Sequence, residues 1–115
     1  MKRINVQMAD PVFAPGVTKT AKIPITVTPT GLSCNVELFL GPNASTKVVT
    51  SGLKPFTSTG LQQIISAPVI MPSPATGTAY HVYIDLYVAG MYLAGYTATE
   101  DVVIPSGIVG PITWE

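Results

Sequence analysis

Few side chains in this sequence could act as an acid, a base or a nucleophile. His81 is the only histidine, and Asp85 follows it by four residues in a segment with the alternation of a β-strand. At about 3.3 Å per residue the two side chains stand roughly 13 Å apart, too far for a hydrogen-bonded dyad. Glu100 and Asp101 form an adjacent acidic pair, which we expect to be a solvated turn because calcium needs several oxygen ligands in one loop.

Cys34 is the only cysteine, and it shares the register of Val36, Leu38 and Leu40. We expect it to be a small buried hydrophobe, because no second ligand lies nearby to support the alternative of a reactive or metal-binding thiol. A single cysteine also excludes an internal disulfide. The sequence therefore predicts no catalytic residue, no metal site and no cofactor, and we expect that the protein is not an enzyme.

The charge of the chain is low and balanced. Only 10% of the 115 residues are charged, and six basic side chains offset six acidic ones. A neutral chain has no electrostatic footprint for nucleic acid or for an anionic membrane surface, so we expect neither partner. A surface with few charges is poorly protected against association, which favours contact with other protein.

The longest alternating segment runs from Tyr80 to Val88 and predicts a β-strand with one buried face. The inward face would consist of Tyr80, Val82, Ile84, Leu86 and Val88, and the outward face of His81, Tyr83, Asp85 and Tyr87. Ala89 and Gly90 then form a tight turn into an antiparallel partner strand.

The rest of the chain is typical of an all-β fold, an antiparallel β-sandwich of about seven to eight strands. Helical periodicity is absent, and eleven prolines and ten glycines divide the chain into short extended segments. Besides the hairpin, we expect strands over residues 3–9 (Ile4, Val6 and Met8 inward), 18–28 (Ala21, Ile23, Ile25 and Val27 inward), 32–40, 47–50 and 102–104. Pro24 predicts an edge or a bulge in its strand, Pro68 an interruption of the extended segment 61–71, and 52–60 a mobile connection.

These strands resemble bacterial immunoglobulin-like domains. In the cell-adhesion-related type, often abbreviated CARDB, a loop glycine precedes a tyrosine that opens an alternating strand and a hairpin glycine follows, as Gly77, Tyr80 and Gly90 do here. The resemblance covers roughly residues 12–104 and places Tyr80 at the tyrosine corner. The absence of a cysteine pair, and of a tryptophan in residues 32–40, excludes an antibody-type domain. The resemblance implies an immunoglobulin-like fold with a binding or spacer role, and it carries over no site residue.

An outward aromatic row is the first candidate interaction surface. Tyr83 and Tyr87 lie on the outward face of the long strand, and Tyr92 or Tyr96 joins them across the hairpin. Such a row forms either cross-strand aromatic pairs on the outer side of a sheet or a contact surface for sugar or protein. For a contact surface we prefer protein, and carbohydrate remains possible without being indicated.

The C-terminal segment is the second candidate. We expect one domain over residues 1–104, followed by an extended tail over residues 105–115 that contains Ile108, Val109, Ile112 and Trp114. A disordered tail would be polar, so these residues pack either on their own domain or on a neighbouring subunit. Our hypothesis is that the tail, together with residues 1–8, crosses to an adjacent subunit of a homo-oligomer.

The sequence thus predicts a non-enzymatic structural protein that acts through protein–protein assembly. No apolar segment follows Met1 as in a secretory signal, and no run of 18 apolar residues spans a membrane. We expect a phage or virus particle component (capsid decoration, tail or head–tail protein), made in the host cytoplasm and located in the virion. The alternative is an accessory immunoglobulin-like module of a bacterial surface or secreted protein, part of a longer chain at the cell surface or outside the cell, which binds carbohydrate or acts as a spacer.

Overall fold

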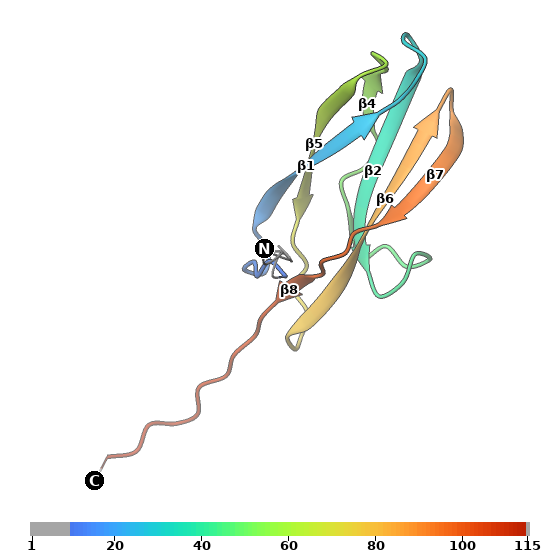
Figure 1. Ribbon diagram of the computed structural model, residues 1–115. Helices are drawn as coiled ribbons and strands as arrows, with labels where there is room; N and C mark the ends of the chain where they lie inside the picture. Colours follow the sequence, from blue (N-terminus) through green and yellow to red (C-terminus); the bar gives the residue numbers. More distant parts are fainter. Residues whose placement is uncertain (1–9, 115) are drawn as a thin grey trace, which may run out of the picture.

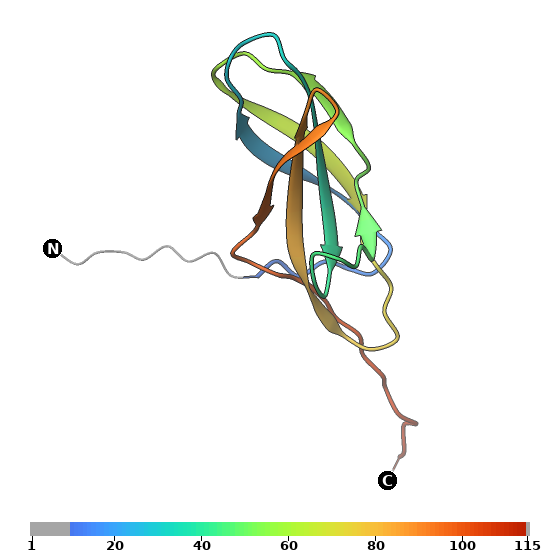
Figure 2. The same ribbon diagram turned by 90° about the vertical axis from the view of Figure 1, so that its right-hand side faces the viewer.

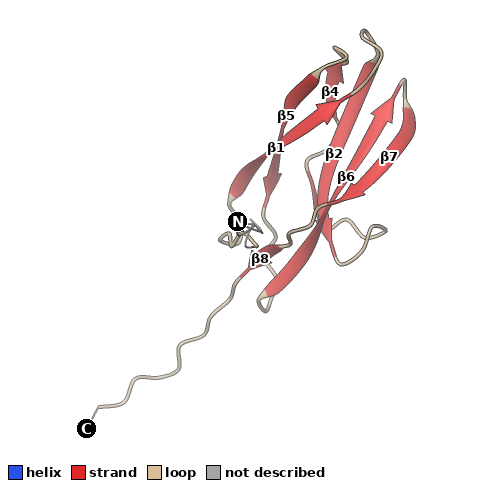
Figure 3. Cartoon of the chain, viewed as in Figure 1, coloured by secondary structure: helices blue, strands red, loops and turns tan. Residues whose placement is uncertain are grey.

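The computed structural model describes residues 10–114, so the strand expected over residues 3–9 lies outside the described range. Eight β-strands and no helix occur within residues 10–114 (Figure 3). The strands are β1 (Thr18–Thr26), β2 (Ser33–Gly41), β3 (Val49–Thr50), β4 (Lys54–Thr57), β5 (Gln62–Ile70), β6 (Thr78–Val88), β7 (Met91–Thr97) and β8 (Val102–Ile104). The expectation of an all-β protein is therefore confirmed.

The strands form two antiparallel sheets that share one hydrophobic core. β1 and β5 pair over their whole length as a two-stranded sheet. The second sheet has the order β3-β2-β6-β7, with β4 also paired to β2 and β8 to β6. Figures 1 and 2 show β1 and β5 side by side in one layer and β2, β6 and β7 in the other. The narrower sheet therefore covers only part of the wider one.

The core forms where the apolar faces of the two sheets meet. β6 buries Tyr80, Val82 and Leu86 and half-buries Ile84 and Val88, as its alternation predicts. The facing sheet adds residues of the expected inward sets, and β2 supplies several of the most deeply buried side chains. The core includes Ile23, Ile25, Val27, Cys34, Val36, Leu38, Leu40, Ala67, Val69, Met71, Val102 and Ile104. The burial of Cys34 confirms its prediction as a small hydrophobe.

Pro68 does not interrupt its strand, contrary to the sequence prediction. β5 runs unbroken from Gln62 to Ile70, with Pro68 opposite Thr20 and Ile64 opposite Pro24. Pairs in an antiparallel ladder alternate between those that exchange both N–H···O bonds and those that exchange none. Because proline has no N–H, both prolines fit the second kind without loss. The expected placement of Pro24 on an edge strand is confirmed, because β1 pairs only with β5 among the described residues.

The segment 52–60, expected to be a mobile connection, instead contains β4. Two buried serines hold this segment against β2. The Ser51 hydroxyl accepts a hydrogen bond from the Leu38 N–H (3.0 Å), and the Ser58 hydroxyl accepts one from the Leu32 N–H (2.8 Å) and donates to the Pro29 carbonyl (2.6 Å). These contacts lie 13 to 29 residues apart in sequence, so local composition could not indicate them.

The hairpin between β6 and β7 closes as predicted, through Ala89 and Gly90. Val88 pairs with Met91, which leaves a two-residue turn with φ values of 52° at Ala89 and 78° at Gly90. Positive φ at both turn positions is the requirement of a type I′ hairpin, and it favours asparagine followed by glycine. Ala89 therefore occupies a left-handed conformation that its Cβ disfavours.

We expect Ala89→Asn to stabilise the fold by about 0.5 to 1 kcal/mol, because asparagine tolerates the left-handed region better than alanine does. The substitution keeps the backbone N–H that donates to the Ser33 carbonyl. Urea unfolding measures the change. A loss of stability would mean that the turn does not have this conformation in solution.

Tyr80→Ala should lower the free energy of unfolding by about 3 to 5 kcal/mol, as truncation of a core aromatic does. Tyr80 is only 7% exposed, whereas Tyr92 on the neighbouring strand is 60% exposed and serves as the matched control. Tyr92→Ala should cost about 1 kcal/mol or less, because it loses mainly a surface aromatic pair. Equal melting temperatures for Tyr80→Ala and the parent protein would contradict the assigned inward face of β6.

Candidate interaction surfaces

Of the four tyrosines expected in the aromatic row, three lie on the outer face of the wider sheet. Tyr87 and Tyr92 are cross-strand partners whose rings meet edge to face, with centroids 5.8 Å apart. Tyr83 stacks on Phe39 of β2 at 5.2 Å. Phe39 is almost fully buried beneath Tyr83 and the Lys47 side chain, whose ammonium lies 4.9 Å from the ring centroid. The outer face therefore carries a small aromatic cluster, of which Tyr92 is the most exposed member.

Tyr96 lies on the opposite face, so the aromatic row does not extend to it. A β-bulge shifts the register of the hairpin between Leu86 and Tyr87, so that Tyr92 pairs with Tyr87 but Tyr96 pairs with the inward-facing Ile84. One extra residue on a strand moves every later side chain to the other face. The alternation of the sequence gives no sign of this bulge, because Tyr92 and Tyr96 are four residues apart and would share one face of an unbroken strand.

Gly95 creates the space that the Tyr92 ring occupies. A Cβ atom at Gly95 would collide with the Tyr92 hydroxyl oxygen and would lie 3.1 Å from a carboxylate oxygen of Asp85. Tyr92 can therefore lie across the sheet beside Asp85 only because residue 95 has no side chain. This close approach explains the glycine within a strand, where it costs conformational entropy.

A small charged cluster borders the aromatic residues. Lys47 donates a hydrogen bond to Glu37 Oε1 at 2.8 Å, and the Thr50 hydroxyl donates to Glu37 Oε2 at 2.5 Å. Burial alone would raise the pKa of Glu37, but the hydrogen bonds from Lys47 and Thr50 and the charge of Lys47 together lower it below its usual value. The hydrogen bond to Glu37 and the charge of that carboxylate raise the pKa of Lys47 although burial lowers it. The ion pair therefore compensates a carboxylate that is itself nearly buried.

Asp85 lies next to Glu37 in the β2–β6 ladder and shows the opposite shift. Burial raises its pKa, the charge of Lys47 lowers it, and the charge of Glu37 raises it again, so the net direction is upward. A single ammonium group thus stands near two carboxylates, and its hydrogen bond goes to Glu37. Ionised Asp85 consequently opposes folding, whereas ionised Glu37 supports it.

His81 finds an acidic partner that the sequence did not indicate. Its Nδ1 lies 2.8 Å from Asp101 Oδ1, although the two residues are 20 positions apart. The turn after β7 brings Asp101 beside β6, and the backbone N–H of Asp101 in turn donates to Asp10 Oδ1. Half of the His81 side chain is exposed, so this contact lies at the surface. Cys34 and the buried Ser51 and Ser58 are enclosed in the fold and not placed beside this histidine.

Neither a metal site nor a membrane-spanning helix is found in the described part of the chain. Within residues 10–114, no three histidine, cysteine, aspartate or glutamate side chains converge as ligands would. The same residues include no helix with the length and apolar character needed to cross a membrane.

The C-terminal tail leaves the domain and does not pack on it. Its four large apolar side chains are exposed by 98% at Ile108, 88% at Val109, 73% at Ile112 and 90% at Trp114. Figure 1 shows the tail running away from both sheets after β8. The Ser106 hydroxyl accepts a hydrogen bond from the Gly77 N–H at 2.7 Å, which anchors the start of the tail at the lower end of β6. Packing of the tail on its own domain, one of the two arrangements predicted, is therefore not observed.

Comparison with known proteins adds no family to this description, because searches of protein-family models, of curated proteins and of solved structures each found no match.

The two neighbouring carboxylates should respond to pH with opposite signs. Because the pKa of Glu37 is lowered, its contribution to stability is present above the ordinary carboxyl pKa and is lost as the pH falls through the folded value. Glu37→Gln should therefore destabilise the protein at pH 7 by about 1 kcal/mol, given the exposure of Lys47. Because the pKa of Asp85 is raised, Asp85→Asn should stabilise it, by about 1 kcal/mol or less.

The difference for Asp85→Asn should disappear as the pH falls below the ordinary aspartate pKa, and that for Glu37→Gln only as the pH falls below the lowered pKa of folded Glu37. Urea unfolding of the parent and of both variants over this pH range measures them. Two substitutions with the same sign at pH 7 would contradict the assignment of Lys47 to Glu37.

Proposed function

We propose that this protein is a structural, non-enzymatic subunit that works by assembling with other protein subunits. The exposed apolar tail is the observation that carries the proposal. Leaving a large apolar side chain in water forgoes about 1.5 to 3 kcal/mol of burial, and four such residues lie in a row of seven. A monomer would keep this unfavourable surface, whereas a neighbouring subunit could cover it.

The sequence of the tail suits binding in an extended form. Pro105, Gly107, Gly110 and Pro111 exclude a regular helix, and Ile108, Ile112 and Trp114 share one face of an extended chain. The anchor between Ser106 and Gly77 directs the following residues away from the subunit's own core. We infer that the tail binds a second copy of the chain, or another subunit of the same particle, by adding along a sheet edge or lying in a groove.

The finer proposal is an immunoglobulin-like β-sandwich, closest to the CARDB type, that forms part of a phage or virus particle. Two antiparallel sheets around one core and the buried Tyr80 at the start of β6 support the fold. A small domain with an apolar arm and only 10% charged residues suits a capsid decoration, tail or head–tail protein, whose surfaces meet other protein. Capsid, portal or terminase genes beside the gene for this chain would support this assignment.

The aromatic pair on the outer face favours a second candidate function. Tyr87 and Tyr92 offer an amphipathic surface of the kind that binds sugar rings or protein, as expected for an accessory module of a bacterial surface or secreted protein. Glycan binding by the parent protein that Tyr92→Ala abolishes would favour this module over the particle subunit.

Removing the tail should convert the assembly to monomers without unfolding the domain. A chain that ends at Gly107 keeps the Ser106 contact with Gly77 and loses only residues 108–115. We expect a lower mass by light scattering, and an unchanged β-sheet circular dichroism spectrum because residues 108–114 contribute no strand.

A full-length variant with Ile108→Ser, Val109→Ser, Ile112→Ser and Trp114→Ser provides the matched control for chain length. It should behave as the truncated chain does, because the apolar side chains and not the backbone length drive association. A parent protein that is monomeric at all concentrations, or a truncated chain that keeps the mass of the parent, would contradict the proposed function.

A further inference from the structure

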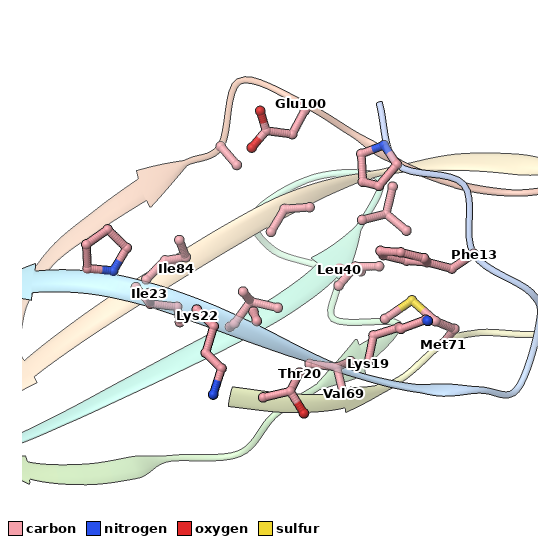
Figure 4. Close-up of a pocket in the computed structure, with 17 residues that line it drawn as sticks. Phe13, Lys19, Thr20, Lys22, Ile23, Leu40, Val69, Met71, Ile84 and Glu100 are labelled. Carbon is pink, nitrogen blue, oxygen red and sulfur yellow. The ribbon is translucent and has the colours of Figure 1, made fainter. Parts of the chain in front are cut away.

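An apolar groove runs between β1 of the narrower sheet and the segment that follows β7. One wall is β1 from Lys19 to Pro24, the opposite wall includes Ala98, Glu100 and Val102, and the floor consists of core residues such as Leu40, Val82 and Ile84. Figure 4 shows Glu100 on the segment across from β1, and Phe13 and Met71 at one end. This part of the groove has a volume of about 340 Å³. A second hollow continues it along β1 as far as Thr26 and Tyr96.

The edge of β1 beside this groove has an unused set of backbone hydrogen-bonding groups. Pro24 and Pro68 require that the even-numbered residues of β1 lie in pairs that exchange no bonds with β5. In agreement, the odd-numbered Val17 just before β1 accepts a bond from the Met71 N–H of the neighbouring chain segment. The N–H groups of Thr20, Lys22 and Thr26 therefore point along the sheet toward the open edge, where no strand is paired among residues 10–114.

The described chain starts at Asp10, next to Pro11 at the mouth of this groove. Pro11 and Phe13 line the groove, and Val12 and Phe13 pair with Val103 on the wall across from β1. A turn with a positive φ at Gly16 then reverses the chain, and the Lys19 ammonium lies over the Phe13 ring. Residues upstream of Asp10 that continue this direction would thus run antiparallel to β1 along its open edge.

The sequence of residues 3–9 has the pattern that the groove and the edge require. Ile4, Val6 and Met8 alternate with Arg3, Asn5, Gln7 and Ala9, so one face is apolar and the other is small or polar. In an antiparallel strand added to β1, the outward residues would exchange the backbone bonds, and none of them is a proline. Seven residues extend about 23 Å, which matches most of the length of β1.

We propose that the groove is the binding site of the chain's own N-terminal segment, residues 3–9, which adds to β1 as a third strand of the narrower sheet. Ile4, Val6 and Met8 fill the apolar groove, and the segment covers the open edge. The tether at Asp10 gives this segment an effective concentration in the millimolar range, which a second copy of the chain does not reach in dilute solution. The edge of β1 is then unavailable for edge-to-edge association, and the exposed tail remains free to bind a partner.

Amide hydrogen exchange of the full-length protein, followed by NMR, tests the proposal at single residues. Thr20, Lys22 and Thr26 are exposed residues whose N–H groups have no β5 partner, so an open groove predicts rapid exchange. When residues 3–9 are bound, amide exchange at Thr20, Lys22 and Thr26 should be at least about tenfold slower than for an open edge, and it should not depend on protein concentration. Ala21 and Ile23, which pair with β5, report that the domain itself stays folded.

Two double variants change the same segment on opposite faces. Ile4→Ser with Val6→Ser removes the apolar side chains and should restore fast exchange at Thr20, Lys22 and Thr26. Asn5→Ser with Gln7→Ser changes as many residues on the outward face and should leave these amides slow.

Three outcomes would overturn the proposal. Fast exchange at all three amides in the parent protein would show an open edge. Protection that increases with protein concentration would assign the groove to a second copy. Protection that survives Ile4→Ser with Val6→Ser, but is lost in the chain ending at Gly107, would assign the groove to the tail and so support assembly while excluding this site for residues 3–9.

Discussion

The ladder between β2 and β6 positions almost every feature of this protein. It pairs eight residues on each strand, from Cys34 opposite Val88 to Gly41 opposite His81. Because side chains alternate strictly between the two faces of a strand, this one register directs Val36, Leu38 and Leu86 into the core. The same register places Glu37, Phe39, Tyr83 and Asp85 together on the outer face. A slip of one residue would bury the carboxylates and expose the core, so the register is strongly specified.

The two faces of this sheet are stabilised by different interactions. The inner face is closed by apolar contact with β1 and β5, which contributes through burial and does not depend on pH. The outer face has too little apolar surface for a second core, and there Lys47 covers Phe39 with its stem while its ammonium compensates Glu37. Asp85 lies beside that pair without an ammonium of its own, which makes the outer face the part of the domain that is sensitive to pH.

Edge strands with no neighbouring strand among the described residues give this fold surfaces for association. β1 and β7 are both edge strands within the described residues, and the narrower sheet leaves a groove between them. Exposed edges and exposed apolar segments favour binding to another chain, and this protein has few charges to oppose it. An N-terminal strand on β1 and an exposed tail would divide these tasks, since one segment completes the domain and the other is left for a partner.

The sequence by itself determined the features that depend on neighbouring residues. Alternation predicted β6 with its buried face from Tyr80 to Leu86. A glycine directly after the alternating segment predicted the hairpin at Ala89 and Gly90, and Pro24 predicted an edge strand. Tertiary structure decided what depends on contacts between distant segments. The hydroxyls of Ser51 and Ser58 hold the segment that contains β4 against β2. Pairing with Thr20 accommodates Pro68, and a bulge turns Tyr96 to the inner face. The turn after β7 brings Asp101 to His81. Local composition carries no record of these contacts, because each partner lies elsewhere along the chain and only the register of the sheets brings the two together.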